Sequence, residues 1–95
     1  MADEAHLRAS LLRGLAGDEA AHRGFLTDAA GLLRSYFRNR LRGQAEDAED
    51  LVQETLVALH TRRHTYDPNY PLTAWMYAIE RYRFIDFLRR SKHRA

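Results

Sequence analysis

The spacing of apolar residues between positions 46 and 62 is the feature that most constrains the fold. These residues recur at intervals of three and four, which is the period of one helix face, and not at every second position as in a half-buried strand. The stripe consists of Ala48, Leu51, Val52, Thr55, Leu56 and Leu59. Because a stripe of this width must be buried against other elements, the segment predicts one helix of a packed helical domain.

The same period marks three further segments, and no segment shows the alternation of a strand. We expect these three helices over residues 4–15, 19–41 and 72–90. Gly17 is suited to end the first helix and Asp18 to cap the second. Pro68 and Pro71 bracket a loop before the last helix, and Pro71 is tolerated at a helix start. The sequence predicts an all-α fold, a compact bundle of about four helices.

Size and composition narrow the class of protein. The 95 residues allow one domain. The absence of cysteine excludes disulfides, thiolate metal sites and a cysteine nucleophile. No apolar run approaches the roughly 20 residues that span a bilayer. We therefore expect a cytoplasmic protein without membrane insertion.

Catalytic and metal-binding patterns are missing from the sequence. Among the five histidines only His60 and His64 have the i, i+4 spacing of a helical ligand pair, and the helix is expected to end between them. The acids between residues 46 and 54 lie on one solvated helix, and no glycine-rich phosphate loop occurs. We expect no catalytic residue, no metal site, no cofactor and no enzymatic activity.

The net charge of +2 is unevenly distributed. Residues 45–55 carry five acids and no base, whereas residues 81–94 carry six bases and one acid, Asp86. One acidic face and one basic helix indicate two different partners. Two ordinary solvated helix faces would give the same pattern, and charge alone does not decide between these interpretations.

Two segments carry a family resemblance. The first, residues 47–56, reads Asp-Ala-Glu-Asp-Leu-Val-Gln-Glu-Thr-Leu. The second begins at residue 72 as Leu-Thr-Ala-Trp-Met-Tyr-Ala-Ile and continues from residue 85 as Ile-Asp-Phe-Leu-Arg-Arg. Together they resemble region 2 of bacterial sigma factors of the extracytoplasmic-function (ECF) type, and the resemblance extends from about residue 7 to 92. It implies that residues 1–95 form a region 2 domain, and we expect the family's second helical domain, region 4, to be absent from them.

The resemblance also implies a polymerase-docking surface. A polar face of the third helix, distinct from its apolar stripe, would bind the clamp helices of the β′ subunit of the RNA polymerase core. Its residues are Asp50, Gln53, Glu54 and Val57. An acidic helix face that meets basic side chains would speed and orient the encounter. The alternative is that these acids only cap the helix and keep it soluble.

For promoter DNA, the resemblance implies that the loop and the start of the fourth helix recognise and melt the −10 element. The non-template strand would be held single, with one base turned into a loop pocket and stacked on tyrosine rings. Phosphates would bind the basic side chains of the fourth helix. The expected DNA-binding residues are Tyr66, Asn69, Tyr70, Thr73, Trp75, Arg81, Arg89, Arg90 and Lys92. The spacing of Trp75 also fits a core position, so both roles remain open for it.

Two residues of the fourth helix depart from the family pattern, and a third is expected to have a structural role. Glu80 stands where the family usually has a small residue, and Tyr82 where an Asn is common. These departures weaken any detailed transfer of base specificity. Asp86 lies near the inward stripe, where we expect it to pair with a nearby Arg.

The fourth helix is apolar nearly all round. The resemblance therefore also implies a protein partner, an anti-sigma factor that would cover part of this helix.

Two other functions fit parts of the sequence. A helix-turn-helix duplex reader would place the fourth helix in a major groove, but such helices present polar residues to base edges. A helical adaptor would use only the acidic helix, leaving the basic helix and the aromatic loop without a role. Preference for single-stranded over duplex DNA separates the sigma-type function from the first alternative, and any DNA binding speaks against the second.

Overall fold

The computed structural model describes residues 3–94, and for residues 93 and 94 only their place in a helix. Its elements are α1 (Glu4–Leu15), α2 (Glu19–Arg40), α3 (Ala45–Thr61), a short 3-10 turn (Arg63–Thr65) and α4 (Leu72–Arg94). The part of the chain that the structure describes contains no strand. The prediction of an all-α bundle of about four helices is confirmed.

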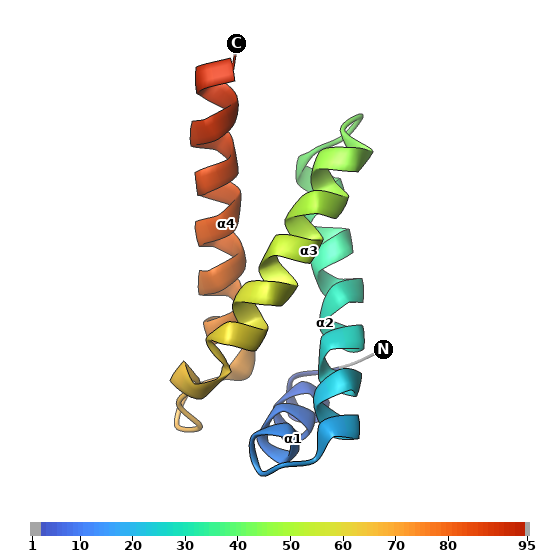
Figure 1. Ribbon diagram of the computed structural model, residues 1–95, viewed down its shortest axis with the longest axis vertical. Helices are drawn as coiled ribbons and strands as arrows, with labels where there is room; N and C mark the ends of the chain where they lie inside the picture. Colours follow the sequence, from blue (N-terminus) through green and yellow to red (C-terminus); the bar gives the residue numbers. More distant parts are fainter. Residues whose placement is uncertain (1–2, 95) are drawn as a thin grey trace.

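The helices form an elongated bundle of 45 × 23 × 20 Å. α2 and α3 run side by side in opposite directions, and α3 in turn contacts α4 (Figure 1). α1 packs across the end of the bundle where α2 begins. The loop between α3 and α4 lies at this same end, while the α2–α3 connection lies at the opposite end (Figure 1). The fold therefore brings the first helix of the chain next to the loop that precedes the last.

The core lies where α1, α2 and α3 meet. The expected stripe of α3 is buried except for Leu56, which is half-buried. The apolar spacing of the second helix predicts a buried stripe of Phe25, Ala29, Leu32, Leu33 and Tyr36. Of these, Phe25, Ala29 and Leu33 are buried, whereas Leu32 and Tyr36 are half-buried. The large ring of Phe37 is also fully buried, although it was not among the expected core residues. It continues the stripe of Phe25 and Leu33 at helical spacing, so the pattern itself contained this position.

Local signals set the helix boundaries. The Asp18 side chain accepts a hydrogen bond from the Ala21 backbone N–H at 3.0 Å, which confirms Asp18 as the N-cap of α2. Gly17 has φ 109° and Gly43 has φ 79°, a region that glycine enters without strain. The expected bounds hold to within a residue for the first three helices. α4 runs one turn longer than expected, to Arg94.

α4 is only partly buried, although it is apolar nearly all round. Leu72, Met76 and Phe87 are buried, while Tyr82 and Leu88 are exposed. The reason is that α4 packs mainly on α3, and its C-terminal half diverges from the other helices (Figure 1). None of the described helices is both long and apolar enough to cross a membrane.

Candidate nucleic-acid interface

The loop between the 3-10 turn and α4 is compact and internally bonded. The Tyr66 hydroxyl donates to the Tyr70 carbonyl at 2.8 Å. The Asn69 backbone N–H donates to the Asp67 carboxylate at 2.9 Å, and the Tyr70 N–H donates to the Asp67 carbonyl at 3.0 Å. Pro68 within this turn has a fixed φ. The loop therefore has one defined shape before any ligand binds.

Trp75 lies half-buried beside this loop. Its indole Nε1–H donates to the Thr65 hydroxyl at 3.0 Å, and its ring centroid is 5.7 Å from that of Tyr66. These residues line a hollow of about 310 Å³, a size near the lower end of small-ligand pockets, roughly 300–1,000 Å³. The residues that line it are Thr65, Tyr66, Asp67, Tyr70, Ala74 and Trp75. Trp75 thus packs on the core with one side and borders the hollow with the other.

Tyr66 is almost fully shielded from solvent. The residue is only 5% exposed, because its ring packs into the core and its hydroxyl is bonded to the loop. Tyr66 therefore forms a wall of the hollow and is not an open platform for stacking. Of the two loop tyrosines, Tyr70 is the one accessible from solvent, at 64% exposed.

Thr73 is already hydrogen-bonded within the fold, whereas Asn69 is exposed at the loop. The Thr73 hydroxyl donates its hydrogen to the Glu4 carboxylate at 2.9 Å. It could donate to DNA only if this bond opened. Asn69 is exposed at the tip of the loop, next to the tyrosine that borders the hollow. Asn69 is therefore the better placed of the two to reach a base edge.

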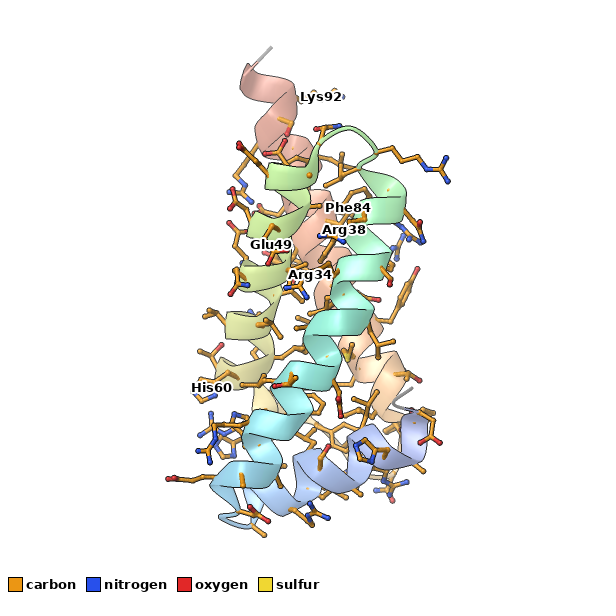
Figure 2. The ribbon with its side chains drawn as sticks, turned by 90° about the vertical axis from the view of Figure 1, so that its right-hand side faces the viewer. Arg34, Arg38, Glu49, His60, Phe84 and Lys92 are labelled. Atoms are coloured by element: carbon orange, nitrogen blue, oxygen red, sulfur yellow. The ribbon has the colours of Figure 1, made fainter. Side chains whose placement is uncertain are left out.

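The four basic residues of α4 that were expected at DNA are exposed, but one of them, Arg90, is engaged in ion pairs. Arg81, Arg89 and Lys92 point to solvent, and Lys92 lies near the far end of α4 (Figure 2). Arg90 instead forms ion pairs with Glu54 of α3 at 3.2 Å and with Asp86 at 3.3 Å. The expected pairing of Asp86 with an Arg is confirmed. A phosphate would have to compete with two carboxylates for the Arg90 guanidinium.

The polar face of α3 is accessible. Asp50, Gln53 and Val57 are exposed, with Val57 at 62%, while Glu54 is half-buried by its contact with Arg90. This is the same group of residues that the sequence assigned to one face. Three of them are therefore free of the bundle, whereas Glu54 also ties α3 to α4.

An ion pair borders this face. Arg34 of α2 donates from Nε and Nη2 to the two Glu49 carboxylate oxygens, each at 2.9 Å, and the two side chains face each other in Figure 2. Gln53 adds a third hydrogen bond at 3.3 Å. The hydrogen bonds from Arg34 and Gln53 lower the pKa of Glu49 to about 2. Glu49 is thus negatively charged at physiological pH and holds α3 against α2.

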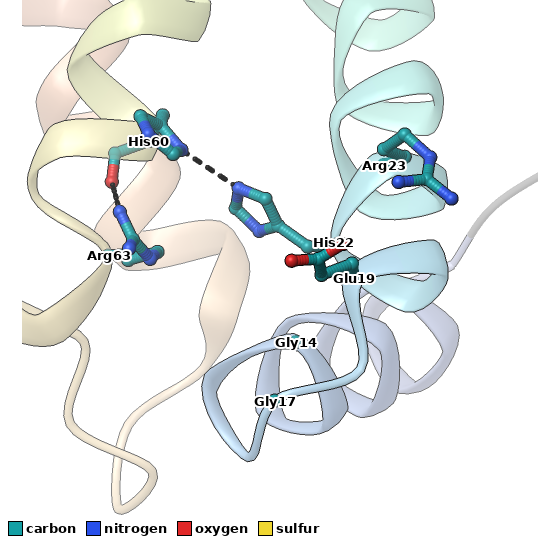
Figure 3. A pocket seen from close by; sticks show the side chains of 7 residues that line it. All are labelled: Gly14, Gly17, Glu19, His22, Arg23, His60 and Arg63. Atoms are coloured by element: carbon teal, nitrogen blue, oxygen red, sulfur yellow. Dashed lines mark hydrogen bonds between the residues drawn. The ribbon is translucent and has the colours of Figure 1, made fainter.

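A histidine pair joins α2 and α3 at the end of the bundle nearest α1. His22 Nε2 and His60 Nδ1 are 2.9 Å apart (Figure 3), beside a hollow of about 410 Å³. Burial, followed by the nearby charges of His60 and Arg63, lowers the pKa of His22. The sequence does not reveal this pair, because the two histidines are 38 residues apart and lie on different helices. Among the described residues no group of three or more potential metal ligands occurs.

Glu80 is the most unusual titratable group. It is 8% exposed on α4, and burial raises the pKa of its carboxyl to about 7, against the opposing effect of Arg40. A carboxylate in an apolar site loses hydration that nothing fully replaces. This is the position at which the sequence departs from the small residue usual in the family, and burial there disfavours the charged carboxylate.

Similarity to known proteins shows the family to which the chain belongs. Residues 25–94 match the family model for Sigma-70 region 2, so the chain belongs to the Sigma-70 region 2 family. More particularly, it is 50% identical over 91 residues to the ECF RNA polymerase sigma factor SigF of Caulobacter vibrioides, covering 96% of this chain and 51% of SigF. The chain thus spans about half the length of the curated relative that it matches. No solved structure matches it. The resemblance inferred from the sequence is confirmed.

Proposed function

We propose that this chain is the region 2 module of an ECF-type sigma factor that acts in transcription initiation. It binds the β′ clamp helices of the RNA polymerase core through α3 and captures the non-template strand of the −10 promoter element at the α3–α4 loop. Its place of action is the cytoplasm, where the polymerase core works on DNA. The observation that carries the proposal is the preformed hollow between Tyr70 and Trp75 on a domain of this family.

The chemistry of the hollow fits an unstacked base. Turning a base out of a duplex costs a few kcal/mol, and stacking it on an aromatic ring returns about 1–3 kcal/mol. Tyr70 and Trp75 supply the rings, and the Asp67 carboxylate supplies a polar partner for a base edge. The Thr65 hydroxyl already donates to the Arg62 carbonyl at 2.7 Å, so its hydrogen is used within the fold. Because the loop is already ordered, little conformational entropy is lost on binding.

A positively charged track leads away from the hollow along α4. Arg81, Arg89 and Lys92 are exposed and available for phosphates, which supply affinity without sequence information. Arg90 joins this track only when its ion pairs with Glu54 and Asp86 open.

The exposed part of the α3 face, Asp50, Gln53 and Val57, is the proposed polymerase-docking surface. It combines a charge for orientation with an apolar side chain for contact. We further propose an anti-sigma protein as a partner, because several large side chains of α3 and α4 remain exposed. These are Val57, Tyr77, Tyr82 and Leu88.

Charge reversal at Asp50 tests polymerase docking. Asp50 is exposed, so we expect Asp50→Arg to leave the fold intact while reducing capture by immobilised β′ clamp helices at least tenfold, a loss of about 1.4 kcal/mol. The matched control is Glu19→Arg on α2, because Glu19 is also an exposed acid. Capture of wild type and both variants alike would contradict docking through α3.

DNA capture is tested by the fluorescence of Trp75, the single tryptophan of the chain. We expect single-stranded oligonucleotides to quench it and duplexes of the same sequence to leave it nearly unchanged. We expect Tyr70→Ala to weaken single-strand binding by about tenfold, since stacking contributes about 1–3 kcal/mol per base. Stronger binding to the duplex would favour the helix-turn-helix alternative and overturn the proposed strand capture.

A further inference from the structure

The N-terminus of α4 is capped by a residue from the other end of the chain. The Glu4 carboxylate accepts hydrogen bonds from the Leu72 backbone N–H at 2.9 Å and from the Thr73 backbone N–H at 2.8 Å. It also accepts the Thr73 hydroxyl at 2.9 Å. Glu4 lies in the first turn of α1, 68 residues before Leu72. The first turn of α4 is therefore fixed by α1.

This cap replaces one that the local sequence does not provide. Helix N-termini leave backbone N–H groups without partners, and a Ser, Thr, Asp or Asn side chain just before the helix usually accepts from them. Here Pro71 precedes α4, and proline has no such acceptor. Burial opposes ionisation of Glu4, but the hydrogen bonds from Thr73 and Leu72 outweigh it and lower the pKa of Glu4. The negative charge also suits the positive end of the α4 dipole.

A second contact ties the loop itself to α1. One helical turn after Glu4, Arg8 donates from Nη2 to the Pro68 carbonyl at 2.6 Å. Arg8 and Glu4 then stand on one side of a hollow of about 510 Å³, with Asn69 and Tyr70 on the other. The loop is thus held at Pro68 and again at Leu72, on both sides of Tyr70.

These contacts are separate from those that hold α1 in the bundle. α1 is anchored by Leu7 and Leu11, which are 1% and 0% exposed. Arg8 is exposed and Glu4 is half-exposed, so neither contributes to that apolar core. Their removal is expected to free the loop while leaving α1 docked.

We propose that Glu4 and Arg8 are positioning residues for strand capture. They act through the loop: Glu4 fixes the start of α4, on which Trp75 stands, and Arg8 fixes the turn from which Tyr70 projects. This inference rests on the proposed capture of single-stranded DNA. It assigns α1 a role in promoter reading, in addition to its role in the core.

The test uses the full chain, a single-stranded DNA hexanucleotide of random sequence and the quenching of Trp75. We expect Arg8→Ala and Glu4→Gln each to weaken binding by about five- to tenfold, because an unfixed loop must be ordered on binding. Arg8→Lys, which retains a donor for the Pro68 carbonyl, is expected to recover part of the loss. Matched controls are Arg13→Ala on the same helix and Glu19→Gln in the first turn of α2.

A salt series distinguishes positioning from direct contact. If Arg8 acts only through the loop, the plot of log K against log salt keeps its slope in Arg8→Ala. Loss of a phosphate contact to a single strand would instead lower the slope by about 0.7. A lowered slope would therefore overturn the positioning role. Thermal melting followed by circular dichroism accompanies each variant, and a loss of binding that only parallels a loss of folded protein also overturns it.

The remaining outcomes separate this inference from the proposed function. If wild-type protein shows no quenching, strand capture and the positioning role both fail. If wild type is quenched and the two variants bind as tightly as it does, strand capture stands and the positioning role is wrong.

Discussion

Glu80 places a carboxyl group where the surroundings favour its neutral form. Its ordinary pKa of 4.5 is raised to about 7 in the folded protein. The folded state therefore binds more protons than the unfolded state between these pH values, and stability falls as pH rises. The resulting destabilisation is absent below about pH 4.5 and complete above about pH 7.

Replacement by the neutral isostere removes this cost. We expect Glu80→Gln to raise the free energy of unfolding at pH 8 by up to about 3 kcal/mol, from about 1.36 kcal/mol per pKa unit. At pH 4.5 the variant and wild type should be nearly equal. Urea unfolding at both pH values measures this, with the exposed Glu19→Gln as the control. A variant that is less stable than wild type at pH 8 would show that the charge is compensated.

Burial distinguishes two residues that look alike in the sequence. Tyr66 and Tyr70 are both aromatic loop residues, and the sequence gives no reason to treat them differently. The fold turns the first inward and leaves the second 64% exposed. Which of two similar side chains faces the core depends on the path of the loop over Trp75, a contact between segments.

At the scale of elements, the contact between α2 and α3 includes a titratable pair. His22 contacts His60, and the Nδ1 of His22 is buried without a hydrogen-bond partner among the described residues. Glu19, Arg23 and Arg63 also line the adjoining hollow. With the pKa of His22 lowered from 6.5, the unfolded state binds more protons below that pH. The stability of this contact is complete above about pH 6.5 and is lost as pH falls through the folded-state pKa.

We therefore expect acid to destabilise wild type more than a variant without this histidine. Between pH 7.5 and 5.5, His22→Gln should lose less unfolding free energy than wild type, as measured by urea unfolding. His64→Gln, at an exposed site, is the control and should follow wild type. Identical pH profiles for His22→Gln and wild type would contradict the assignment.

Some helix caps are formed by residues next to the helix in the sequence, and one is formed by a distant residue. Asp18 and Gly17 were identifiable from the sequence because their partners are neighbours in the chain. The cap of α4 was not, since its acceptor, Glu4, belongs to α1. Local caps follow from local sequence, whereas a cap provided by another helix appears only when both helices are placed.

Across the whole molecule, Phe37 links the helices that form the core to the diverging α4. It is fully buried on α2, and its ring centroid is 6.3 Å from that of Phe84 on α4. We expect Phe37→Ala to cost about 3–5 kcal/mol by loss of burial and creation of a cavity. That is a large part of the roughly 5–15 kcal/mol available to a small domain.

Thermal and urea unfolding measure this loss, with Tyr82→Ala as the control because Tyr82 is 61% exposed. A cost below about 1 kcal/mol for Phe37→Ala would show that the site is not a true core position.

The sequence by itself determined the four helices, most of the core and the family. These depend on periodicity and short motifs, which act within a few residues of one another. The tertiary structure decided which polar groups meet across the bundle: Glu4 with α4, Arg8 with the loop, His22 with His60, and Arg90 with Glu54. Such contacts join residues that are distant in the chain, so their partners are fixed only when packing sets the positions of the helices.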